Sequence, residues 1–459
     1  MASRPDMIEA MDLEDSLSDE TTKTLEMSQT QNDVESPPAH MSISDCATFT
    51  RWRGCYTLAK QYRLKNSLLA GVGLLELANG GDFAANVWNE VPVPHFAAVL
   101  MALGATLALS ISYFAFKDAG LSRRNIHVLR EERRYLRTQK ADHVQDVPIA
   151  RGVQSQLDVN FREMGTELVD RIGMDIVMGF GAICVGIGTF MAIGGANHNV
   201  FLASNLLSGY IGNAPVALYG TANAAWSAFV WRRAYRHGIA GAKELKANVV
   251  ELLLKRRIRR VKIHAAINGV TGIVAGAASL VTATLWYGYP ILVPCIISSI
   301  LCNYIWRNRI GYDRPLIRQR LRVDKISLID ELKSIASARQ ILEEAPSESL
   351  PKLVSDPKSI ASIVVFMRDN DLFEDFCVRL LRDTSLSTSL FGTLKDELTI
   401  DPQSLITADK LHLPRLVQIA QATVSEMGPI RFEYRERYLL EALGCYLCSR
   451  GVETTSEKC

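Results

Sequence analysis

The stretch "LLLKRRIRRVKIHAAINGVTGIVAGAASLVTATLWY", Leu252–Tyr287, decides the class of fold. It opens with six Lys and Arg residues, and Ile263–Tyr287 then runs for 25 residues without Asp, Glu, Lys or Arg. A helix of that length extends about 37 Å at 1.5 Å per residue, enough to cross a hydrocarbon core about 30 Å thick. The stretch therefore predicts a transmembrane helix with a basic segment, Lys255–Lys262, at its N-terminal end.

Five further segments have the same apolar character. Most carry no charged residue, the third contains Asp175, and the first is the weakest because it contains Glu76 and Asp82. Such lengths without charge are unusual for soluble core helices. We therefore expect an all-α, polytopic membrane protein with six transmembrane helices arranged as three hairpins, at about residues 67–87, 96–116, 173–195, 200–231, 263–287 and 289–306.

The basic residues of the connections alternate. Lys and Arg number five in residues 51–65, eleven in 117–171, eleven in 232–262 and six in 307–322. The short intervening loops Asn86–His95, Gly195–Asn199 and Tyr287–Pro290 hold none. Because basic residues are retained on the cytosolic side, this alternation predicts both termini in the cytosol. Nothing in the sequence identifies which membrane.

The fourth segment is longer than a normal span. Val200–Trp231 is uncharged for 32 residues, and Asn213-Ala-Pro215 lies near its middle. Because proline disfavours a continuous helix, two interpretations are open: one long kinked helix, or an interfacial piece over Val200–Ile211 followed by a span from Pro215. The second is slightly favoured.

The basic segment Lys255–Lys262 predicts contact with the membrane surface. Its side chains are expected to face anionic lipid headgroups: Lys255, Arg256, Arg257, Arg259, Arg260 and Lys262. A nucleic-acid partner is not expected, because the chain has a net charge of only +2, with 51 basic and 49 acidic residues.

The two ends of the chain differ from the apolar region. Residues 1–48 hold eleven Asp and Glu but only Arg4 and Lys23 as cations, which is typical of a disordered acidic tail. The membrane domain is expected over residues 49–310. Residues 311–455 are expected to form a cytosolic α-helical domain, because amphipathic patterns separated by prolines, Pro429 among them, recur over residues 323–450. That region is predicted to fold without the membrane domain.

Sequence motifs of catalysis are absent. The chain contains no phosphate-binding loop, no His-Glu-x-x-His and no Gly-x-Ser-x-Gly, and its eight histidines never fall at helical i, i+3 or i, i+4 spacing. No cofactor and no metal are therefore expected. Nine scattered cysteines do not form a disulfide framework.

Polar residues inside the predicted spans are the candidate functional residues. Glu76 is expected near the middle of the first span, where an ionised carboxylate is costly. It is either an ion, proton or solute ligand, or a structural carboxyl group. Asp175 is expected in a rim ion pair with Arg171, four residues earlier. Asn79, Asn213 and Asn268 are candidates for hydrogen bonds between helices, and Gly272-x-x-x-Gly276 is a helix-packing pattern.

Two functions from different classes fit this architecture. The first is transport of a solute or ion across a membrane. The second is a scaffold or adaptor that presents cytosolic helices to partner proteins, with a homo-oligomer or a cytosolic partner as its assembly. A water-accessible cavity that reaches Glu76 would favour the first.

Overall fold

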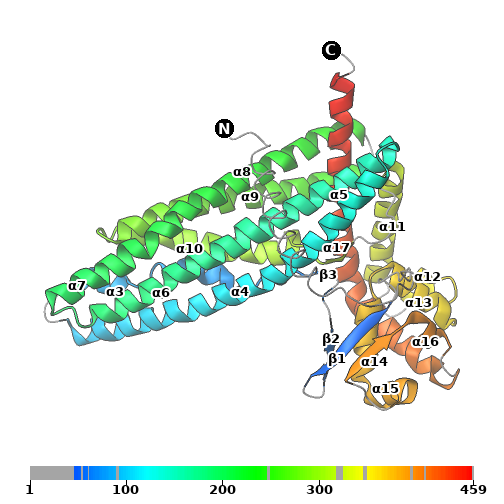
Figure 1. Ribbon diagram of the computed structural model, residues 1–459, viewed down its shortest axis with the longest axis horizontal. Coiled ribbons are helices and arrows are strands. Elements are labelled where there is room, and N and C mark those ends of the chain that lie inside the picture. The colour runs from blue at the N-terminus through cyan, green and yellow to red at the C-terminus, as the bar shows by residue number, and fades with distance from the viewer. Residues whose placement is uncertain are drawn as a thin grey trace, which may run out of the picture. The chain divides into compact units, whose positions relative to one another are not determined.

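The computed structural model describes residues 46–456 except 53–54, 60, 62, 89–92, 246–248, 317–323, 345–348, 393–395 and 408–409. The chain is mainly helical, as the sequence predicts (Figure 1). The predicted acidic tail lies outside the described residues up to residue 45, and its last residues, Ala47 and Thr48, begin a β-strand.

Four helices of the described chain are long enough and apolar enough to cross a membrane: His95–Asp142, Val147–Ala192, Val249–Thr282 and Gly288–Ile310. The first is α4 and the third is α9. The second joins α5 (Val147–Gly165) to α6 (Met174–Ala192) through the π-helical η2 (Thr166–Gly173), and the fourth joins α10 (Gly288–Ile305) to the π-helical η4 (Trp306–Ile310). Large apolar side chains on these helices are exposed, Leu103 and Val270 each to 63%.

The fourth apolar segment is one helical unit. It contains α7 (His198–Asn205), the π-helical η3 (Leu206–Ile211) and α8 (Asn213–Glu244). The favoured break before Pro215 is therefore wrong. Proline has no N–H for the carbonyl of Ile211, and the helix widens just before it, where the N–H of Gly212 donates to Leu207 O at 3.0 Å.

The first apolar segment is not one regular helix. It is divided into η1 (Ala70–Leu74), α2 (Leu75–Ala78) and α3 (Phe83–Val87). Glycine at position 81 permits the close approach of α4, because a Cβ there would lie 3.0 Å from Gly104 O. The expectation of a regular transmembrane helix over residues 67–87 is therefore wrong.

The divided segment nevertheless runs along the apolar part of α4. At one end the backbone N–H of Leu69 donates to Asp118 Oδ1 at 2.8 Å. At the other end Ala84 and Ala85 pack in a buried cluster with Ala97. The two ends thus lie beside α4 residues 21 positions apart, which correspond to about 31 Å of helix.

Two small sheets connect distant parts of the chain. Strand β1 (Ala47–Trp52) pairs antiparallel with β2 (Cys55–Leu58) and with β5 (Glu397–Ile400), so that Phe49 lies opposite both Leu58 and Leu398. Strand β3 (Arg63–Leu64) pairs with β4 (Arg314–Pro315). These pairings bring residues before the first apolar segment to residues after the last one.

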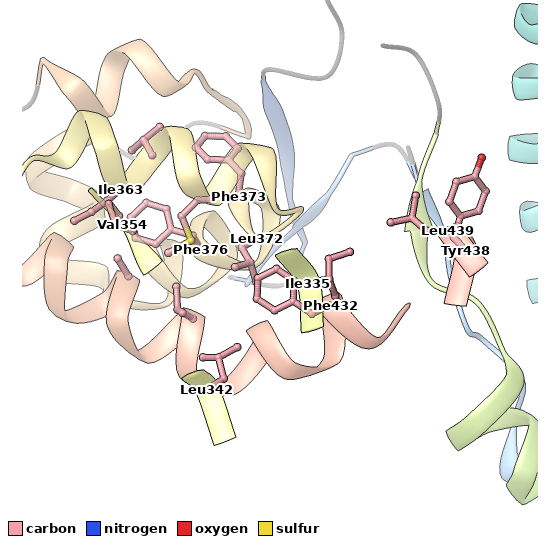
Figure 2. Packing of buried hydrophobic residues seen from close by; sticks show 14 of the residues in the cluster. Ile335, Leu342, Val354, Ile363, Leu372, Phe373, Phe376, Phe432, Tyr438 and Leu439 are labelled. Atoms are coloured by element: carbon pink, nitrogen blue, oxygen red, sulfur yellow. The ribbon is translucent and has the colours of Figure 1, made fainter. Parts of the chain in front are cut away.

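The C-terminal part of the chain is built from helices around one hydrophobic core (Figure 2). Their bounds are α11 (Lys325–Glu344), α12 (Ser349–Leu353), α13 (Ile360–Asp369), α14 (Phe373–Arg382), α15 (Thr384–Phe391), α16 (Pro402–Ile406), η6 (Lys410–His412) and α17 (Leu413–Ser456). Phe376 and Phe432 are fully buried in this core, and Phe49 of β1 joins them. The core therefore includes residues that lie outside the predicted boundary of 311–455.

Helix α17 runs for 44 residues and contains Pro429 in its interior. The proline predicted an end of one helix and a start of another. Instead, packing on both sides of it outweighs the lost backbone hydrogen bond: Val424 and Phe432 are both buried in the same core. The helix thereby carries Glu441 and Cys445 from the C-terminal core to α8.

Phe49→Ala is predicted to destabilise the C-terminal core. The ring is fully buried, so its loss removes apolar contacts and leaves a cavity, at a cost of about 3–5 kcal/mol. Thermal and denaturant unfolding of the purified full chain, followed through the C-terminal helices by hydrogen exchange, measures the loss. Phe180→Ala is the control, because Phe180 is 45% exposed on α6. Equal behaviour of the two variants contradicts the prediction.

Candidate functional site: a polar cavity among the helices

A buried guanidinium joins two of the long helices. Arg314, in β4, donates to Glu132 of α4 at 2.6 and 2.7 Å and to Glu163 of α5 at 2.6 Å. All three side chains are at most 6% exposed. Because each carboxylate receives charge-assisted hydrogen bonds, the desolvation of these charges is offset within the cluster.

A second buried cluster surrounds Glu441 of α17. Arg162 of α5 donates to it in a bidentate manner, and Arg257 of α9 donates through Nη2 at 3.2 Å. Arg233 of α8 approaches it at 3.7 Å. Burial acts to raise the pKa of Glu441, but attraction to Arg162, Arg233 and Arg257 outweighs it, so the pKa falls well below its ordinary value of 4.5.

A third cluster corrects the expected role of Asp175. Arg171 directs its guanidinium to Asp118 of α4, at 2.9 Å, and to Glu167 of η2, at 2.8 Å. The expected rim ion pair between Arg171 and Asp175 is replaced by these two contacts. Asp175 is instead completely buried, close to Asp118. Glu167 and Arg171 stand four residues apart in η2, a spacing that brings two side chains together on one helix face, so this pair was open to prediction from the sequence.

Two pockets lie between the helices. The first, here called the inner cavity, is lined by residues that include Glu76, Asn223 and Asn303. The second, here called the basal cavity, is lined by residues that include Arg257 and Glu441. They have five lining residues in common: Thr166, Asp170, His264, Asn268 and Trp306. The two cavities are therefore adjacent along one wall.

Glu76 of α2 lies on the wall of the inner cavity. Its side chain is buried, and it accepts a hydrogen bond from Asn79 Nδ2 at 3.0 Å. The other polar groups on that wall are amides and hydroxyls from four different elements, together with three titratable side chains: Thr166, Asn223, Asn268, Ser299, Asn303, Asp170, Arg171 and His264. Arg171 is already paired with Asp118 and Glu167. Amide and hydroxyl groups both donate and accept hydrogen bonds, so they suit a polar solute or water near Glu76.

The other asparagines named from the sequence join α8 to α9. Asn213 donates to Ser279 O at 2.9 Å, and Asn268 donates to Ser227 Oγ at 3.3 Å. Asn268 also lines both cavities. Asp82, for which the sequence predicted no role, accepts a hydrogen bond from Tyr289 at 2.8 Å.

The small residues of α9 lie against α8. A Cβ at Gly276 would lie 2.8 Å from Ala217 Cα, and Gly272 lies against Gly220. This glycine pattern thus allows close packing within one chain.

The side chains of the basic segment of α9, Lys255–Lys262, lie in different environments. Arg257 points inward to Glu441, and Lys262 lies over the rings of Trp231 and Tyr235, with Nζ 4.7 and 5.0 Å from their centroids. Lys255 pairs with Glu251 at 2.7 Å. Lys255, Arg256 and Arg259 are exposed and Arg260 is half-buried. The expectation that all six face lipid headgroups is wrong for Arg257.

The site holds no group suited to metal binding among the residues that the structure describes, because no three or more His, Cys, Asp or Glu side chains gather there. His237 lines the basal cavity, where burial first and then the nearby Arg233 lower its pKa to about 3. This imidazole is therefore neutral at physiological pH.

Comparison with known proteins gives no assignment: no protein-family model, no curated protein and no solved structure matches this chain. The chemistry of the two cavities is the remaining guide to function. That chemistry is two carboxylates, one arginine and several amides in the inner cavity, and three arginines around Glu441 in the basal cavity.

Arg314→Gln is predicted to destabilise the protein strongly. It leaves Glu132 and Glu163 buried without their cation, at a cost of about 3–5 kcal/mol. Lys333→Gln is the control, since its pair with Asp330 is 55% and 65% exposed and contributes less than about 1 kcal/mol. Denaturant unfolding of the two purified variants measures both effects. A loss below that of the control would refute the role given to Arg314.

Proposed function

We propose that this protein is a multi-pass integral membrane protein that moves a solute across the membrane through the inner and basal cavities. The observation that supports this is the adjacency of the two cavities, one of which reaches Glu76. The chain combines buried polar groups with exposed apolar side chains on its long helices. This is the distribution expected where lipid is the surrounding solvent.

Within this proposal the chain crosses the membrane six times. Four crossings are the long apolar helices, and α7–α8 supplies a fifth. The divided segment η1–α2–α3 supplies the sixth, because its ends lie beside α4 residues about 31 Å apart, close to the thickness of a hydrocarbon core. Irregular backbone at membrane depth is tolerated where protein surrounds it or where it lines a cavity, and Glu76 lies on such a backbone.

Glu76 has the central place in the proposed mechanism. A carboxylate at this depth is costly unless it is hydrated or paired, and its hydrogen-bond partner Asn79 is neutral. We expect a cation, a proton or the polar part of the solute to compensate it during transport. The basal cavity then provides the passage between Glu76 and the basic, cytosolic ends of the helices.

Glu76→Gln is predicted to reduce flux in proteoliposomes by at least about tenfold, or to abolish its dependence on pH between about 5 and 8. The amide keeps the size and hydrogen bonding of the side chain but removes the charge that titrates. Flux of a candidate solute mixture under a pH gradient measures the effect, and thermal unfolding establishes that the variant is folded.

Glu343→Gln is the matched control for that experiment, because its side chain is 72% exposed in the C-terminal region. Asp175→Asn is not suitable, since Asp175 is buried beside Asp118. Wild-type flux from the Glu76 variant at every pH removes Glu76 from the mechanism. It also shifts preference to the alternative function, a membrane scaffold that presents its C-terminal helices to a partner.

The six-crossing topology predicts opposite exposure of two loops. A glycosylation acceptor inserted at residues 194–197 should be modified in secretory membranes, and one inserted at residues 143–146 should not. Both loops contain exposed residues, so insertion at either is compatible with folding. Gel mobility before and after glycosidase treatment gives the result. Modification of the second loop alone would reverse the orientation, and modification of both would contradict the number of crossings.

A further inference from the structure

Arginines outnumber carboxylates on the wall of the basal cavity. Arg162, Arg233 and Arg257, from three different helices, converge on Glu441. Arg162 makes the bidentate pair, so the other two are held less completely. Nε of Arg233 is buried and, among the described residues, has no hydrogen-bond partner. A carboxylate that accepts two hydrogen bonds from Arg162 cannot satisfy all the N–H donors of three guanidinium groups.

Neighbouring carboxylates compensate this cationic wall only in part. Glu163 lies 3.7 Å from Arg162 Nη2, but it is bound more closely by Arg314, which also holds Glu132. Asp170 also lines the cavity, so two carboxylates face three guanidinium groups there.

The rest of the cavity wall is mainly aliphatic. Eight aliphatic side chains line it: Val230, Ala234, Leu254, Ile258, Val261, Ala265, Ile310 and Leu440. Its polar members besides the charged groups are Thr166, Ser227, His237, His264 and Asn268. A free inorganic anion leaves such an apolar wall without contacts, whereas a molecule with a charged head and an apolar chain contacts both parts.

We propose that the basal cavity binds an amphiphilic organic anion, a carboxylate or phosphate headgroup that carries an apolar chain. The headgroup accepts hydrogen bonds from Arg233 and Arg257, while Arg162 keeps Glu441 in place. The chain lies against Leu254, Ile258 and the other aliphatic residues. This inference rests on the proposed transport function and names the class of solute. Free fatty-acid-like anions and anionic membrane lipids both have this combination of a charged headgroup and an apolar chain.

Arg257→Gln tests the headgroup contact. The purified full chain in nonionic detergent is titrated with dansyl-labelled undecanoic acid, whose fluorescence rises in an apolar site. The variant is expected to bind it about tenfold or more weakly, the effect of one lost charge-assisted hydrogen bond. Arg256→Gln is the matched control, because the neighbouring Arg256 is exposed and does not line the cavity. If the first variant does not fold, Arg233→Gln replaces it. Equal binding by variant and control overturns the proposal.

Competition experiments identify the source of the ligand. Oleate is expected to displace the probe and oleyl alcohol is not, because only oleate carries the anion. Displacement by phosphatidic acid without displacement by oleate assigns the site to a membrane lipid, within the same chemistry. Displacement by oleyl alcohol as strong as that by oleate, or by inorganic phosphate alone, overturns the amphiphile.

Glu441→Gln separates ligand contact from a structural role. Removal of this carboxylate frees Arg162 and strengthens the cationic wall, so the dissociation constant of the probe is expected to fall. A folded variant with an unchanged or higher dissociation constant contradicts the proposal.

Binding and flux together separate this inference from the transport function. The same anion is offered to proteoliposomes that contain the wild type or Glu76→Gln. Specific binding without flux retains the anion site and rejects transport of that anion. Flux of another solute without specific binding of the probe retains transport and rejects the anion site.

Discussion

The buried Arg314 and its two glutamates are the interaction on which the rest of the structure depends. Arg314 directly follows the last long helix and reaches back to Glu132 on α4 and Glu163 on α5, which places three separate parts of the chain around one guanidinium. Its neighbour Pro315 pairs with Arg63 in the two-stranded sheet, and Arg63 contacts Asp313 at 2.8 Å. A buried pair of this kind contributes little net free energy relative to an apolar replacement, but removal of one member is expensive. The main effect of this cluster is geometric, because its hydrogen bonds fix the position of β4 relative to α4 and α5.

Helix α5 extends that constraint to the C-terminal region. Glu163 binds Arg314 and the preceding Arg162 binds Glu441 of α17, and adjacent positions on a helix point about 100° apart. One helix therefore serves two ionic clusters on different faces. Through Glu441 the long helix α17, with its C-terminal core, is tied to α8 and α9 by Arg233 and Arg257. The basal cavity lies where these helices meet, so its charged wall also holds the apolar helices and the C-terminal core together.

The sequence predicted the elements that depend on uniform composition. The absence of charge over Ile263–Tyr287 and Phe96–Phe116 gave two of the long helices, because length and hydropathy are local properties. The prediction failed where tertiary packing determines the local structure: Pro215 and Pro429 remain inside helices that surrounding packing stabilises. Glu76 was identified because a carboxylate stands out among apolar residues. Glu163 and Arg314 were missed, since each belongs to a charged stretch in which only tertiary contacts distinguish buried from exposed groups.

The two cavities differ in what the protein has already neutralised. The hydrogen-bond partner of Glu76 is the neutral Asn79, and Arg171 on the same wall is already paired with Asp118 and Glu167, so Glu76 has no cation of its own among the groups that line the cavity. Around Glu441 the opposite holds, because one carboxylate is surrounded by three arginines and its own charge is fully used. Asp170, which lies on both walls, stands between the two regions. Under the proposed transport function, a cation or proton is therefore attracted to the inner cavity and an anion to the basal cavity, and a solute that carries both features has a favourable position in each.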